Sequence, residues 1–233
     1  MKFKNKTLGE IVADNFRASQ VFQRYNIDFC CAGKRGFIEA CIAAKLDPEV
    51  VEREILNLEQ DAAHDIDYNA MQPDKLIDFI LREHHQYIEA ESRSLPALAD
   101  KVAQVHRDKH PELVEVAQTV HLIMEDMLVH QRKEEEILFP YIKAMVESKK
   151  NGTALPEACF GNIANPIGAM EADHDHVGAL IFRLKELTSD FTLPDDACSS
   201  YTTLYKRLEE LQNNTFRHVH LENNILFKEA LKM

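Results

Sequence analysis

The sequence predicts an all-α protein in which a small helical domain precedes an up-down four-helix bundle. The 233 residues contain only seven glycines and eight prolines, too few for a turn-rich β architecture, so long helices are favoured. The later part of the chain has four long stretches in which apolar residues recur every three or four positions, the spacing of one helix face. Short polar breaks separate these stretches, as expected for a four-helix bundle.

The charge and the chain ends exclude several classes of function. A net charge of -12 argues against nucleic acid and against an anionic membrane surface as partners, since both need a basic face. Residues 1–10 are not followed by an apolar run, so no signal peptide is expected, and no segment is apolar for long enough to span a membrane. An odd number of cysteines fits a reducing cytoplasm better than a disulfide framework; the five are Cys30, Cys31, Cys41, Cys159 and Cys198.

Residues 1–60 are expected to form a small domain of three short helices. Thr7 and Glu10 have the spacing of a capping box at the start of the first helix, and Pro48 occupies the first turn of the third. The Gly-containing turn over residues 28–36 holds the adjacent cysteines Cys30 and Cys31. A domain of this size is marginal for independent folding, so we expect it to dock on a neighbour or on a second subunit.

Residues 61–72 lack apolar periodicity and are expected to be a linker to the bundle, which occupies residues 73–233. The four bundle helices are predicted over residues 73–106, 111–148, 163–189 and from 195 to the C-terminus. Each contains an apolar stripe that should face the core.

Polar residues interrupt these stripes at positions where leucine or isoleucine would be expected. The last helix presents Leu204, Leu208, Leu211, Thr215, His218, Glu222, Ile225 and Leu226 on one face, and the second presents Val120, Met124, Met127, His130, Glu134, Ile137 and Tyr141. The third helix contributes His174. The first contributes His84 or His85, between which periodicity does not decide.

Four inward histidines and two inward glutamates predict a metal centre. A buried carboxylate is costly unless another charge compensates it, and two metal ions would do so. In the H-x-x-x-E pairs of two helices, the imidazole and the carboxylate lie one turn apart and point the same way, so each glutamate can bridge two ions. Mixed imidazole and carboxylate donors without thiolate suit iron or manganese better than structural zinc. We expect two iron ions in an oxo-bridged di-iron centre, with about one exchangeable position on each ion.

Other interpretations of these residues exist. A single inward histidine is ordinarily a core residue; the repetition over four helices is what favours metal. Glu171 and His174 have the E-x-x-H spacing of ferritin-type ligands, but Glu171 lies off the apolar stripe. His106, at the end of the first bundle helix, is an alternative ligand. Cys30 and Cys31 are either inert thiols or a thiolate pair that receives or passes iron or senses oxidants.

Three bundle segments, HQRKEEEILFP (130–140), EADHDHVGAL (171–180) and RHVHLENNILF (217–227), resemble the hemerythrin-like RIC proteins, the family for repair of iron centres. The turn DFCCAGK (28–34) resembles the short Cys-Cys domain that precedes the bundle in that family, so the resemblance covers nearly the whole chain. It implies metal ligands at His130, Glu134, His174, His218 and Glu222. The family's remaining ligand stands 21 residues before a second histidine, and counting back from His106 selects His85 over His84.

The resemblance also implies a role. Such a protein restores iron–sulfur clusters damaged by nitric oxide or oxidants, acts in the cytoplasm on damaged iron–sulfur proteins, and forms a homodimer. Our leading hypothesis is a stress-response protein that supplies iron, with Cys30 and Cys31 guiding or accepting the departing ion. The alternatives are an enzyme that reduces nitric oxide or peroxide at the same centre, and a sensor of nitric oxide or oxygen. Whether the chain is an enzyme stays open at this point.

Overall fold

The computed structural model describes residues 1–58 and 66–233. Within these ranges the regular secondary structure is helical, and the β contact recorded there is one isolated bridge between Thr7 and Gly36. The all-α prediction is therefore confirmed. The chain divides into two compact units, one of residues 1–76 with 217–233 and one of residues 77–216.

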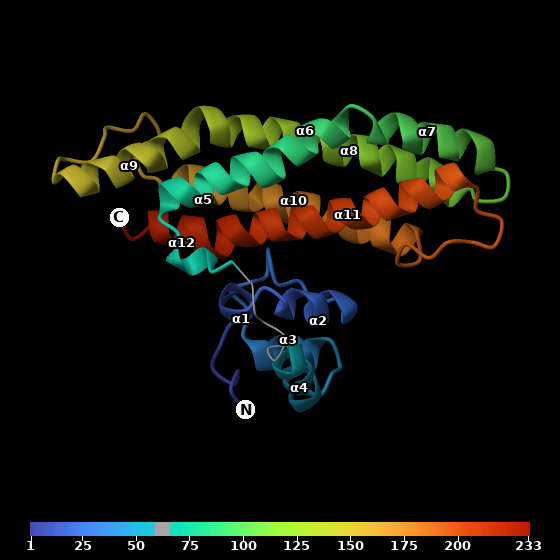
Figure 1. Ribbon diagram of the computed structural model, residues 1–233, viewed down its shortest axis with the longest axis horizontal. Helices are drawn as coiled ribbons and strands as arrows, with labels where there is room; N and C mark the ends of the chain where they lie inside the picture. Colours follow the sequence, from blue (N-terminus) through green and yellow to red (C-terminus); the bar gives the residue numbers. More distant parts are fainter. Residues whose placement is uncertain (59–65) are drawn as a thin grey trace. The chain divides into compact units, whose positions relative to one another are not determined.

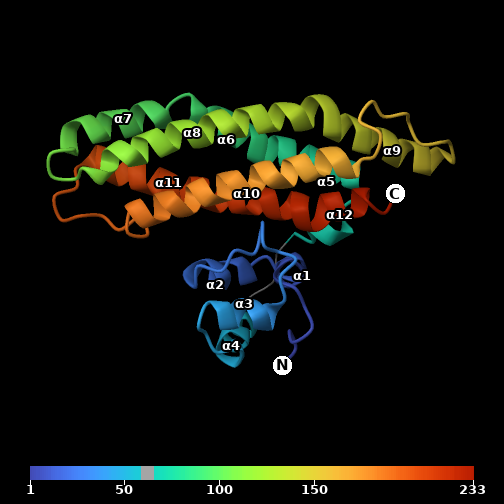
Figure 2. The ribbon, with the colours of Figure 1, turned by 180° about the vertical axis from the view of Figure 1, so that it is seen from behind.

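The unit of residues 77–216 is a bundle of long helical segments, seen from opposite sides in Figures 1 and 2. Helices α6 and α7 pack against α8, and α8 packs against α10. The core between them is made of aliphatic side chains such as Ile88, Val102, Ile123 and Ile181, each almost fully buried. The helical segments that lie wholly or partly in this unit are, in chain order, α5 (Pro73–Ile80), η3 (Leu81–His85), α6 (Gln86–Ser92), α7 (Leu95–His106), α8 (Glu112–Lys133), η4 (Glu134–Leu138), α9 (Phe139–Asn151), α10 (Ala164–Leu187) and α11 (Ser199–Leu221).

The first bundle helix is less regular than its sequence predicts. The expected helix over residues 73–106 is interrupted at Ser94, whose backbone leaves the helical region with φ -140°, and α7 restarts at Leu95 with Pro96 in its first turn. Proline has no N–H to donate to the preceding turn and fits the start of a helix. The interruption therefore lies where the proline requires it.

The second bundle helix changes register at η4, a π-helical turn over Glu134–Leu138. We expected Ile137 to face the core, and this was wrong: Ile137 is 48% exposed, whereas Leu138 is 1% exposed. A π turn forms i→i+5 hydrogen bonds and so adds one residue to the turn. Every position after it is displaced around the helix relative to a regular α-helical pattern.

In the other unit, residues 1–58 form four short helices where three were expected: α1 (Leu8–Asp14), α2 (Ala18–Arg24), α3 (Phe37–Ala43) and α4 (Pro48–Leu58). The first expected helix is divided at Asn15, which adopts an extended conformation. The predicted capping box is confirmed, because Glu10 N donates to Thr7 Oγ1 and Thr7 N donates to Glu10 Oε2. Phe22, which is fully buried, contacts the rings of Phe29 and Phe37.

The same unit includes the end of the chain, with η5 (Glu222–Leu226) and α12 (Phe227–Ala230). Within it, η5 packs against α1. Of the expected linker, residues 61–65 lie outside the described residues; the remainder holds a 3₁₀ turn, η2 (Tyr68–Ala70). Among the residues that the structure describes, no helix is both long and apolar enough to cross a membrane.

Candidate metal centre

Four proposed ligands lie together inside the bundle. Glu134 Oε2 is 3.3 Å from His85 Nε2 and also 3.3 Å from His130 Nε2. The Nε2 atoms of His130 and His174 are 3.0 Å apart. The four side chains are buried, with Glu134 completely inaccessible. One carboxylate oxygen therefore lies between two imidazole nitrogens, as expected for a bridging ligand.

The remaining two proposed ligands form a pair near the end of the chain. His218, on α11, and Glu222, at the start of η5, are both completely buried. His218 Nε2 lies 2.9 Å from Glu222 Oε1. The pair has the i,i+4 spacing that places two side chains on one helix face.

Two groups of buried donors have the geometry to hold a metal ion. One comprises His85, Glu134, His218 and Glu222, and the other His130, Glu134, His174 and Glu222. Within each group, one ligand atom from every residue lies within 4.8 Å of the others. Both groups include Glu134 and Glu222, so the two carboxylates are shared while each imidazole belongs to one group. This is the arrangement of two adjacent metal positions with bridging carboxylates.

Three of these six residues lie in π-helical turns. His85 ends η3, Glu134 begins η4 and Glu222 begins η5. Such turns are rare in proteins and are frequent at functional sites, because they displace a side chain from its α-helical direction. Each of the three turns contains a proposed ligand, and this local geometry supports a functional rather than a purely structural role for these residues.

Carboxylates hold the outer nitrogens of two proposed ligands. His85 Nδ1 donates to Glu135 Oε1 at 2.7 Å, and His130 Nδ1 lies 3.3 Å from Asp173 Oδ2. Burial alone would raise the pKa of Asp173, but hydrogen bonds from Lys133 and His130 lower it below its usual value. Both carboxylates keep the proton on Nδ1, so Nε2 is the nitrogen available to a metal. Glu135 is exposed, yet it contacts His85, one of the proposed ligands.

The donor set fits a metal centre on energetic grounds. Glu134 and Glu222 are completely buried, and burying two carboxylates in an apolar interior costs several kcal/mol for each ion even after relaxation. Neutral imidazoles supply hydrogen bonds but no compensating charge, whereas divalent or trivalent cations supply both charge and coordination. The residues present therefore suit cations with mixed nitrogen and oxygen ligands.

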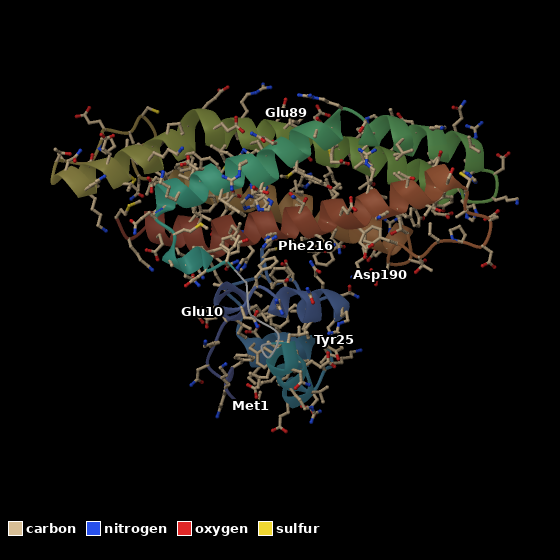
Figure 3. All side chains as sticks on the ribbon, viewed as in Figure 1. Met1, Glu10, Tyr25, Glu89, Asp190 and Phe216 are labelled. Carbon is tan, nitrogen blue, oxygen red and sulfur yellow. The ribbon has the colours of Figure 1, made fainter. Side chains whose placement is uncertain are left out.

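A cavity of about 410 Å³ reaches one of these ligands from the protein surface. His85 lines it together with three glutamates, Glu89, Glu135 and Glu136, and one arginine, Arg132, so the charged side chains of the wall are negative on balance. Glu89 is labelled at the outside of the bundle in Figure 3. An acidic wall raises the local concentration of cations and disfavours anions. The cavity is large enough for small molecules or hydrated ions to reach the imidazole of His85.

The residues that we had kept as alternatives occupy different environments. His84 is buried and its Nδ1 lies 3.2 Å from Asn214 Oδ1. His106 contacts the ring of Tyr201, and its Nε2 lies 3.3 Å from Cys198 Sγ. Among the described residues, neither belongs to any group of possible metal donors, and neither does Glu171.

The adjacent cysteines form a second small cluster. Cys30 is buried, Cys31 is partly exposed, and their Sγ atoms are 3.9 Å apart. Asp28 Oδ1 accepts hydrogen bonds from the backbone N–H groups of both. Burial, the neighbouring Cys31 and Asp28 raise the pKa of the Cys30 thiol well above its usual value. One ligand atom each from Asp28, Cys30 and Cys31 lies within 4.8 Å of the others, a geometry that could hold an ion.

The helical bundle and its buried donors define a hemerythrin-like metal-binding protein. Family models support this class: residues 76–230 match the hemerythrin HHE cation-binding domain, and residues 4–59 match ScdA_N, described as a domain of unknown function (DUF542).

Curated relatives extend over the whole chain and are called iron–sulfur cluster repair protein YtfE. The one from Enterobacter sp. (strain 638) is 33% identical over 231 residues, which cover 99% of each protein. The one from Dickeya chrysanthemi (strain Ech1591) is 32% identical over 232 residues, 100% of this chain and 99% of the relative. The one from Cronobacter sakazakii (strain ATCC BAA-894) is 34% identical over 231 residues, 99% and 98% respectively. The chain therefore belongs to the hemerythrin-like RIC family, whose members carry a Cys-Cys domain ahead of an HHE bundle, and the resemblance stated from sequence is confirmed.

Proposed function

We propose that this protein binds two iron ions and supplies iron to iron–sulfur clusters damaged by nitric oxide or oxidative stress. The observation that carries the proposal is the pair of four-donor groups that share Glu134 and Glu222. The proposed ligands are His85, His130, Glu134, His174, His218 and Glu222. The relatives' printed name, iron–sulfur cluster repair protein, supports the role.

The donor set suits ions that can be released. Six protein ligands, of which two are shared, leave part of two octahedral coordination shells to water or other small ligands. Reduction of the iron lowers the positive charge of the ion. The carboxylates then bind the ion more weakly, which favours its release. The acidic cavity beside His85 offers a cation a path to the surface.

The adjacent thiols have a proposed part in this transfer. Cys30 and Cys31 lie close enough for both sulfurs to contact one ion, and the Asp28 carboxylate is beside them. Binding a metal ion favours the thiolate over the thiol, which would offset the raised pKa of Cys30. The pair would then accept or guide an ion on its way to a client protein.

We further propose that the chain acts in the cytoplasm as a homodimer and that its partners are damaged iron–sulfur proteins. Residues 1–60 would form the Cys-Cys domain, 61–72 the linker and 73–233 the di-iron bundle. The net charge of -12 supports a protein partner over nucleic acid or an anionic membrane.

Transfer of iron to a damaged protein tests the proposal. A hydratase whose cluster has been damaged by nitric oxide is incubated anaerobically with the iron-loaded protein and a reductant. We expect its activity to recover faster than with the same amount of free ferrous iron. The Glu134→Ala variant, which cannot hold two ions, should give no advantage over free iron. Recovery no better than the free-iron control would overturn the donor role.

The same variant separates donation from redox catalysis. An enzyme that reduces nitric oxide or peroxide would turn over steadily with an electron donor, keep its iron throughout and lose turnover in Glu134→Ala. A donor loses iron in proportion to the clusters repaired. Measuring iron retention beside client recovery therefore distinguishes the two functions, and a structural change on nitric oxide binding without turnover or iron loss would indicate a sensor instead.

A further inference from the structure

Asn224 connects the cysteine turn to the segment that carries Glu222. It lies in η5, two residues after Glu222, and its side chain is 7% exposed. Its Nδ2 donates to the backbone carbonyl of Cys30 at 3.1 Å and lies 3.3 Å from Nδ1 of His220. The side-chain amide of Asn224 therefore contacts both the backbone of Cys30 and the imidazole of His220.

Two glycines are required by the close approach of this amide. A Cβ atom at Gly9, in α1, would lie 2.2 Å from Asn224 Oδ1, and one at Gly33 would lie 2.3 Å from the same atom. Gly9 N also donates to Gly33 O at 2.9 Å, which holds the two glycines beside each other. Neither glycine has a positive φ. The absent side chains are therefore explained by contact with Asn224, not by an unusual backbone conformation.

The helix that carries Asn224 has two different faces. His218 and Glu222 form one i,i+4 pair, and His220 and Asn224 form a second pair displaced by two residues. A displacement of two positions puts the pairs on opposite sides of the helix. The imidazole of His220 is fully buried and contacts the rings of Phe16 and Phe29, the residue before Cys30. One face therefore offers metal donors while the other is packed against the cysteine turn.

We propose that Asn224 is a positioning residue that couples the Cys30–Cys31 turn to the metal ligand Glu222. A shift of the turn moves Asn224 because two glycines and a carbonyl enclose its amide, and Asn224 shares a five-residue π turn with Glu222. The coupling acts in both directions: a shift of the turn changes the position of Glu222 and so the affinity for metal, and occupancy of the metal centre changes the position of the turn and so the exposure of its thiols. The inference rests on the proposed function in that it takes Glu222 to bind iron.

Thiol alkylation of the full-length protein tests the coupling. The rate of modification at Cys30 and Cys31 is measured by mass spectrometry on metal-free and iron-loaded protein. We expect iron to slow the wild-type reaction at least about fivefold, the lower end of ordinary coupling between sites. In Asn224→Ala the rates with and without iron should agree within about twofold. A wild-type rate that ignores iron, or an iron effect that persists in Asn224→Ala, would overturn the inference.

Two glycine substitutions in the same loop provide a matched pair. Gly33→Ala places a methyl group against Asn224 Oδ1, whereas a Cβ at Gly36 meets nothing within 4 Å. We expect Gly33→Ala to change the absorption spectrum of the iron-loaded centre and the alkylation rate, and Gly36→Ala to change neither. Combined with Asn224→Ala, which removes the obstructing amide, Gly33→Ala should have no further effect.

The outcomes separate this inference from the proposed function. One outcome is that the purified protein binds two iron ions while Gly33→Ala and Gly36→Ala give the same absorption spectrum and the same alkylation rate. In that case the proposed coupling is wrong and the proposed di-iron centre is unaffected. If the wild type binds no iron, the proposed function itself fails. If Asn224→Ala does not fold, the comparison of the two glycine variants still decides. A role limited to packing would lower the stability of Asn224→Ala while leaving the effect of iron on alkylation intact.

Discussion

The Glu135 carboxylate accepts a 2.7 Å hydrogen bond from Nδ1 of His85, although 48% of the Glu135 side chain is exposed. Its neighbour Glu134 lies on the other side of the same ring, 3.3 Å from Nε2. Two consecutive glutamates therefore contact opposite nitrogens of one imidazole. The outer contact fixes the tautomer and the orientation of the ring, and the inner one belongs to the proposed metal centre.

Replacing Glu135 with glutamine should weaken metal binding without disturbing the fold. The amide removes the negative charge that makes His85 a stronger donor, and loss of such an outer partner typically lowers metal affinity by about 10–100-fold. The measurement is competition for iron with a chelator of known affinity. Glu136→Gln is the matched control, because Glu136 lines the same cavity without a recorded contact to His85. Equal affinities of the two variants would contradict the positioning role of Glu135.

Replacing Glu222 with glutamine should have opposite effects on the metal-free and the metal-loaded protein. Glu222 is completely buried, so removing its charge relieves a desolvation penalty when no cation is present. The loaded protein loses a shared ligand and with it the stabilisation that bound metal gives the native state. We expect a higher melting temperature than wild type in chelator and a lower one in saturating iron.

Thermal unfolding of both proteins in both conditions measures these changes. Glu229→Gln, at an exposed position near the same chain end, is the control and should follow wild type in each condition. A Glu222→Gln protein that is less stable than wild type even in chelator would show that the carboxylate is stabilised by the protein alone.

The sequence predicted most of the apolar pattern because an α-helix repeats locally. On α11 and η5 the predicted stripe is buried throughout, from Leu204 to Leu226. The pattern failed where the helix stops being regular. Periodicity could not choose between His84 and His85 because both are buried and both lie in the π turn η3. Ile137 was misplaced because η4 adds a residue.

Contacts between distant segments were also beyond a reading of local pattern. Asp173 and His130 are 43 residues apart, and Glu135 and His85 are 50 apart. Whether these residues meet depends on which helices become neighbours in the fold, and the apolar pattern of a single helix does not contain that information. The one available signal was adjacency, since Glu135 follows Glu134 and Asp173 precedes His174 in the chain. The enclosure of Asn224 by two glycines left no periodic signal at all.

The shifted register after η4 can be tested by two alanine substitutions. Leu138→Ala removes a side chain that is 1% exposed and should lower the free energy of unfolding by about 2–5 kcal/mol. Ile137→Ala removes one that is 48% exposed and should change it by no more than about 0.5 kcal/mol. Chemical denaturation of the metal-free variants gives both values. A regular α-helix through these residues would give the reverse order.

Burial also orders three of the thiols, Cys159, Cys198 and Cys41, by their expected reactivity and gives that order a pH dependence. Cys159 and Cys198 are exposed, whereas Cys41 is buried, and burial raises its pKa to about 11. The thiolate is the reactive form, so at pH 8 about one molecule in a thousand carries a Cys41 thiolate. We expect alkylation of native, metal-free protein at pH 8 to modify Cys159 and Cys198 before Cys41. Because the raised pKa disfavours the thiolate until high pH, the rate at Cys41 should still be rising between pH 9 and pH 11.

Protein unfolded in denaturant is the control and should lose both the order of reaction and this late rise. A native Cys41 alkylation rate that levels off near pH 9 would show that its thiol is not shielded by the fold.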